Sequence, residues 1–83
     1  MKTDFYFIAH DKIEPKVQAI ERLRAFGASV TQYPRKAEMP LTATRYRVQW
    51  DGSASEYFAL ARLVQQINKE YHETSLKAYE VTQ

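Results

Sequence analysis

With 83 residues, of which 45% are hydrophobic and 13% aromatic, the chain is long enough to bury one core and too short for two. It has no cysteine, which excludes a disulfide framework, thiolate catalysis and thiolate metal sites. The formal net charge is only +2, and no apolar run approaches the length of a membrane-spanning helix. We therefore expect a single domain over residues 1–83, located in the cytoplasm and without a membrane partner.

The first third of the chain predicts a strand, a helix and a second strand. Residues 5–9 form an aromatic and branched run that is typical of a strand, and residues 28–33 predict the second one. Between them, apolar residues recur at spacings of three and four, which predicts a helix with one buried stripe that ends at Gly27. This stripe consists of Ile13, Val17, Ile20, Leu23 and Phe26.

The start of this first helix has two solutions. Asp11 and Glu14 have the spacing of a capping box, whereas Pro15 favours the first helical position and a start one or two residues later. The sequence leaves both open.

The second half of the chain predicts a loop, a strand, a helix and a final strand. The loop PRKAEMP contains two prolines, which forbid regular pairing between them. In the stretch that follows, Tyr46, Val48 and Trp50 alternate with Arg45, Arg47 and Gln49. This period of two predicts a strand with one apolar and one polar face.

A second capping box, Ser53 with Glu56, predicts the start of the next helix, which should run to about residue 72. Its apolar stripe consists of Tyr57, Leu60, Ala61, Val64, Ile67 and Tyr71. Residues 76–81 predict the final strand. The order β-α-β-β-α-β favours an α+β, ferredoxin-like sandwich: a four-stranded antiparallel sheet of order 4-1-3-2 with two helices on one face.

In that layout the strand with Arg45 and Arg47 is central, and its polar face points away from the helices. We expect Phe5 and Phe7 to point inward and Tyr6 to stand beside the arginines. A face of Tyr6, Arg45, Arg47 and Gln49 combines a flat ring with fixed positive charge, which suits docking on an acidic partner or stacking on bases. The alternative is that these arginines are only solvated.

The PRKAEMP loop is the second expected surface. Residues 35–47 carry four basic residues and one acidic residue, a local charge of +3 that leaves −1 for the rest of the chain. Met39 and Leu41 are expected to add exposed apolar contacts beside Arg35 and Lys36. The alternative is a loop tip with no partner.

The first strand resembles that of the RNA-recognition motif family. The run FYFIA at residues 5–9 is similar to that family's first-strand motif, and the resemblance implies a stacking role for Tyr6. The stretch RYRVQW departs from the family pattern, because arginines stand where the family carries exposed aromatic residues.

Little in the sequence points to catalysis or metal binding. Of the two histidines, His10 and His72, neither belongs to a ligand spacing such as HExxH, and no glycine-rich phosphate loop is present. A metal held by these histidines with Asp11 and Glu73 is geometrically conceivable, but surface histidines near helix ends are commoner. We expect no cofactor, no metal and no enzymatic activity.

These observations together predict a small non-catalytic binding module that docks on a larger protein or ribonucleoprotein complex as an inhibitor or adaptor. Such a module is comparable to phage or mobile-element accessory proteins that block CRISPR systems. The alternative is a single-stranded nucleic-acid binder that uses the same sheet face. A homodimer is a further possible state, although two like-charged arginine pairs meeting at a twofold axis on this face would repel each other unless acidic groups intervene.

Overall fold

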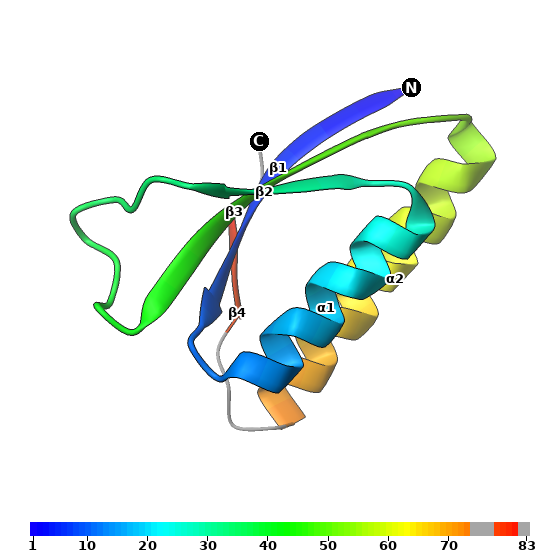
Figure 1. Ribbon diagram of the computed structural model, residues 1–83. Coiled ribbons are helices and arrows are strands. Elements are labelled where there is room, and N and C mark those ends of the chain that lie inside the picture. The colour runs from blue at the N-terminus through cyan, green and yellow to red at the C-terminus, as the bar shows by residue number, and fades with distance from the viewer. Residues whose placement is uncertain (74–77, 82–83) are drawn as a thin grey trace.

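The protein is an α+β domain with two helices on one side of an antiparallel sheet (Figure 1). A computed structural model describes residues 1–73 and 78–81. The elements are β1 (Lys2–His10), α1 (Ile13–Phe26), β2 (Ser29–Tyr33), β3 (Ala43–Asp51), α2 (Ala54–Glu73) and β4 (Ala78–Val81). The predicted order of elements is therefore confirmed, while residues 76 and 77 of the predicted final strand lie outside the described residues.

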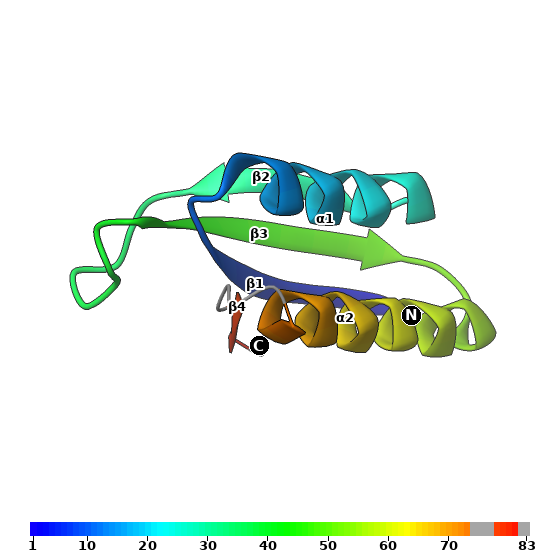
Figure 2. The ribbon, with the colours of Figure 1, turned by 90° about the horizontal axis from the view of Figure 1, so that it is seen from below.

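Strand β3 is the centre of the sheet, because it pairs antiparallel with β1 on one side and with β2 on the other. Along β1, Tyr6 lies opposite Arg47 and Ile8 lies opposite Arg45, and Tyr33 of β2 faces Arg45 from the other side. The short strand β4 pairs with the opposite edge of β1, over Tyr6–Ala9. Figure 2 shows the β2–β3 connection extending past the ends of both helices.

The core lies between the helices and the inner face of the sheet. Tyr46, Val48 and Trp50 of β3 are buried in one cluster with Leu23 of α1 and Leu60 of α2. Full burial of a side chain of this size contributes about 1.5–3 kcal/mol, so the inner row of β3 fixes the register of the strand. The expected inward orientation of this row is confirmed.

Trp50 closes the core at one end. Its ring lies 6.0 Å from that of Phe26 and 6.4 Å from that of Tyr57, measured between centroids, so it is clamped between the two helices. A Cβ atom added at Gly52 would lie 2.4 Å from a carbon of the Trp50 ring, so the position after β3 requires a residue without a side chain.

The two predicted capping boxes have different outcomes. The box at α2 is confirmed, because the Glu56 amide donates to Ser53 Oγ over 3.3 Å and the Ser53 amide donates to Glu56 Oε1 over 3.2 Å. At α1, whose start the sequence left open, the helix begins at Ile13 behind Lys12, which makes no side-chain cap, so the capping-box alternative at Asp11 is not found. The Asp11 carboxylate instead accepts hydrogen bonds from Lys16 Nζ at 3.1 Å and Thr44 Oγ1 at 2.7 Å. Asp11 therefore ties the β1–α1 turn to β3 rather than capping the helix.

The C-terminus of α1 is as predicted. Gly27 adopts a φ of 108°, in the left-handed region, and its amide donates to the Arg24 carbonyl while the Ala28 amide donates to that of Leu23. This pair of hydrogen bonds forms a Schellman motif, which directs the chain into β2.

The predicted stripe of α1 is only partly correct. Ile20 and Leu23 are buried, but Ile13 is 74% exposed and Val17 is 41% exposed. The buried face is instead completed by Ala19, which is 3% exposed. No residue of the first turn of α1 belongs to the core cluster. Ile13 therefore remains in solvent, although its spacing fits the apolar stripe of the helix.

Replacing Ser53 tests the α2 cap. Ser53→Ala removes the hydroxyl that accepts the Glu56 amide, so we expect the free energy of unfolding to fall by about 1 kcal/mol. Urea denaturation followed by circular dichroism measures it. Gln66→Ala, an exposed substitution within α2, is the control and should change stability by less than about 0.5 kcal/mol. An equal effect of both substitutions would contradict the role of the cap.

Candidate functional site

The face of the sheet opposite the helices carries a cluster of aromatic and charged side chains. Because Tyr46, Val48 and Trp50 point into the core, the alternation along β3 turns Arg45, Arg47 and Gln49 to the other side. Tyr6 and Asp4 of β1 and Tyr33 of β2 share this side through the strand register. We call Asp4, Tyr6, Tyr33, Arg45 and Arg47 the tyrosine–arginine cluster.

Arg45 lies across the two tyrosine rings. Its guanidinium carbon is 4.0 Å from the centroid of the Tyr6 ring and 5.5 Å from that of Tyr33. Its Nη1 donates to the Pro34 carbonyl over 3.3 Å, and its Nε is buried without a hydrogen-bond partner within the described part of the chain. The cation is therefore held mainly by the faces of two aromatic rings, which are 5.5 Å apart.

Arg47 is paired inside the cluster. Its Nε donates to Asp4 Oδ1 over 3.0 Å, its Nη2 donates to Asp4 Oδ2, and its Nη1 donates to the Tyr33 hydroxyl over 3.1 Å. This forked contact raises the pKa of Arg47 and, with the arginine as donor, lowers the pKa of Asp4. The positive charge of Arg47 is thus largely neutralised on the sheet itself.

Beyond the cluster, the sheet surface is hollowed. A shallow depression of about 560 Å³ is lined by Lys2, Thr3, Asp4, Gly27, Ser29, Gln49, Trp50 and Asp51. Several of these residues are exposed, and Gln49 is the predicted site residue among them.

The loop between β2 and β3 is held by one side chain. The Arg35 guanidinium donates to four carbonyls of the loop and the start of β3, those of Met39, Pro40, Leu41 and Ala43, at distances between 2.5 and 3.4 Å. Sequence reasoning assigned Arg35 to partner contacts, but its donors are directed at the loop. The structure therefore gives it a positioning role.

Met39 corrects the expectation of an exposed apolar contact. It is only 9% exposed and packs in a small cluster with Ile8 and Ala43. Ile8 faces the same side as Arg45, so Met39 covers the part of the outer face that would otherwise leave an aliphatic side chain in water. Leu41 is 92% exposed, as expected, and Lys36 is exposed.

Two members of the cluster were missed by sequence reasoning. Asp4 lies just before the predicted first strand, which in fact begins at Lys2, and Tyr33 closes the predicted second strand. Asp4 and the Tyr33 hydroxyl contact Arg47 diagonally across the strand pairs, as Tyr6 contacts Arg45, and Tyr33 also lies directly opposite Arg45. The alternation of β2 would have placed Tyr33 on the outer face once the register with β3 was known.

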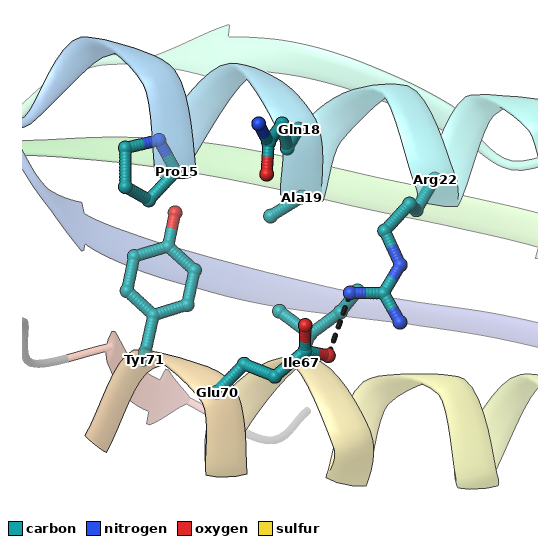
Figure 3. Close-up of a pocket in the computed structure, with 7 residues that line it drawn as sticks. All are labelled: Pro15, Gln18, Ala19, Arg22, Ile67, Glu70 and Tyr71. Atoms are coloured by element: carbon teal, nitrogen blue, oxygen red, sulfur yellow. Dashed lines mark hydrogen bonds and ion pairs between the residues drawn. The ribbon is translucent and has the colours of Figure 1, made fainter. Parts of the chain in front are cut away.

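A second concavity lies between the helices (Figure 3). It measures about 100 Å³, and Arg22 Nη1 of α1 crosses it to Glu70 Oε2 of α2 at 2.7 Å. Tyr71 points into it toward Pro15, and burial raises the pKa of this tyrosine to about 12, which keeps the hydroxyl protonated. The groove is well below the roughly 300 Å³ at which ligand pockets begin.

Among the side chains that the structure describes, no group of three or more His, Asp or Glu is arranged to hold a metal ion. The side chains of His72 and Glu73, which the sequence placed near His10, lie outside what the structure describes. The described helices include none that is long and apolar enough to cross a membrane.

Comparison with known proteins identifies a fold and no family. No protein-family model matches the chain, and neither does any curated protein. Among solved structures, the chain is similar to a C-terminal segment of the alpha subunit of aIF2 from Pyrococcus abyssi, with 15% sequence identity and a TM-score of 0.57. The similarity covers 100% of this chain and 50% of that one, so the chain spans half the length of that structure. At this identity it supports the α+β fold alone.

The Asp4–Arg47 contact predicts a dependence of stability on pH. Because the folded-state pKa of Asp4 is lowered, the contact stabilises the protein above the unfolded-state value, about 4, and this is lost as the pH falls through the folded-state pKa. Wild type should therefore have a higher urea midpoint than Asp4→Asn at pH 7, and the difference should shrink as the pH falls below about 4. Glu21→Gln, on the surface of α1, is the control. A difference between wild type and Asp4→Asn that is as large at pH 2 as at pH 7 would contradict the assignment.

Proposed function

We propose that the protein is a non-catalytic binding module that docks on a larger protein or ribonucleoprotein complex, as an inhibitor or adaptor, through the tyrosine–arginine cluster and the β2–β3 loop. The observation that carries this proposal is the internal pairing of the cluster. Its rings and guanidinium groups are held by contacts with one another, so they form an ordered surface on which Asp4 neutralises Arg47 and Arg45 keeps its charge. Fixed aromatic and arginine side chains are typical anchors of protein interfaces.

The proposal includes a ferredoxin-like arrangement with strand order 4-1-3-2, a single domain over residues 1–83 and a cytoplasmic location. The antiparallel pairings of β3 with both neighbours and the likeness to a solved α+β structure support the arrangement. A phage or mobile-element accessory protein, for example one that blocks a CRISPR complex, fits this class by size and by its reliance on one surface. In that arrangement the cluster occupies the middle of the sheet face, where a docking partner would cover it fully.

Binding of single-stranded nucleic acid is the second candidate, favoured by the tyrosine rings beside Arg45. Two contacts weigh against it. The Arg45 guanidinium lies over the Tyr6 ring, at the place where a base would stack, and Asp4 neutralises Arg47, which would otherwise contact phosphate. A nucleic acid would have to displace both contacts, whereas a protein surface can pack on them as they stand.

Charge reversal at Arg45 tests docking on the sheet face. Immobilised wild-type protein is incubated with extract of the cells that express it, and should bind a protein partner saturably. Free wild-type protein should displace that partner, whereas about tenfold or more free Arg45→Glu should be needed, because removal of a central interface arginine costs about 2 kcal/mol or more. Arg62→Glu, an exposed reversal on α2, is the matched control and should compete like wild type. Equal competition by both variants would exclude the sheet face as the interface.

Titration with labelled single-stranded RNA and DNA at 50 and 200 mM salt separates the two candidates. A docking module should show no binding below about 100 μM, the range of weak non-specific association. Micromolar binding with a steep decrease in affinity at the higher salt, lost in Arg45→Glu, would instead establish the nucleic-acid function.

A further inference from the structure

The β2–β3 loop, residues 34–42, is held by several hydrogen bonds within the loop and to the start of β3. Arg35 donates to the carbonyls of Met39, Pro40, Leu41 and Ala43. Two turns follow one another inside the loop, closed by the Met39 amide on the Lys36 carbonyl and by the Ala43 amide on the Pro40 carbonyl, each at 3.1 Å. One guanidinium therefore fixes both turns relative to each other.

The loop is also attached to the body of the domain at two points. The Met39 side chain is buried against Ile8 and Ala43, and its Sδ accepts the Lys36 amide at 3.4 Å. At the other end, the Asp11 amide donates to the Thr42 carbonyl at 2.7 Å. The loop projects past the helices, yet it is anchored at its base and in its middle (Figure 2).

Leu41 stands out against this order, because it is 92% exposed while its own carbonyl is held by Arg35. A single exposed leucine is ordinary on a protein surface. A leucine presented by a loop whose backbone is already immobilised is different, since the entropy of ordering the loop is lost on folding and not on binding.

We propose that the β2–β3 loop is a preformed recognition element and that Leu41 is its anchor, which inserts into an apolar pocket bordered by carboxylates on the protein partner. This inference rests on the docking function proposed above and names the chemistry of the partner's surface. Charge complementarity supports the carboxylates, because the loop carries Arg35 and Lys36 against one acidic residue, Glu38, and Arg45 donates to the Pro34 carbonyl at its start. The same excess of positive charge disfavours a second copy of this chain as the partner.

Arg35 acts in this proposal as a positioning residue, and its role is testable in the isolated protein. Arg35→Lys keeps the charge but cannot reach four carbonyls at once. We expect the amides of Met39 and Ala43 to exchange with deuterium at least about tenfold faster in Arg35→Lys, as their turns open. Leu41→Ala should leave both rates unchanged. Unchanged exchange in Arg35→Lys would overturn the preformed loop, irrespective of any partner.

The anchor is tested by photo-crosslinking in the whole protein. Benzoylphenylalanine is placed in separate variants at position 41, at position 49 on the sheet face and at position 58 on α2, where Phe58 is 64% exposed. In extract of the expressing cells, positions 41 and 49 should give the same saturable protein adduct and position 58 none. The peptide joined to position 41 should contain apolar residues flanked by Asp or Glu.

The affinity of variants for the crosslinked partner then tests whether Leu41 is the anchor and Arg35 the positioning residue. Leu41→Ala should weaken binding roughly tenfold or more, which corresponds to the burial of one leucine, and Phe58→Ala should not change it. Arg35→Lys should also weaken it, although its charge is intact. An adduct from position 49 without one from position 41, or unchanged affinity of Leu41→Ala, would overturn the anchor and leave the docking function standing. No saturable adduct from either position would overturn both.

Discussion

Burial of the inner row of β3 is the constraint on which the rest of the structure depends. Tyr46, Val48 and Trp50 are held between the sheet and both helices, and a slip of one residue would exchange this row for arginines and a glutamine. With the register fixed, the outward direction of Arg45 and Arg47 follows from the pleat. The outer face is thus a consequence of the core, and its order needs no partner.

What the outer face does with its charges is set by its neighbours. Arg47 pairs with Asp4, Arg45 lies over tyrosine rings, and Arg35 donates to loop carbonyls. Three of the four basic residues between positions 35 and 47 therefore have partners within the chain. Exposed ion pairs contribute little to stability. Their effect here is to immobilise long side chains on the outer face of the sheet.

Prediction from the sequence succeeded where the signal is periodic or local. The alternation in β3, the capping box at Ser53 and the C-cap at Gly27 each involve residues close in the chain, and each is found as expected. It left the start of α1 open, and local spacing could not decide it, because the Asp11 carboxylate accepts hydrogen bonds from Lys16 of the helix and Thr44 of β3. It failed at Met39, because a loop composition gives no sign that one of its residues folds back onto the sheet.

The sequence by itself therefore determined the elements, the inner face of the central strand and the presence of two arginines on the other side. These follow from periods of two and about 3.6 residues, which are properties of the backbone. Tertiary structure alone decided which side chains meet on that outer face. Asp4 reaches Arg47, and Arg45 reaches Tyr6, along diagonals between strands, while Arg35 finds its carbonyls only after the loop has turned twice. Such contacts depend on the register and twist of the paired strands, which no local pattern contains.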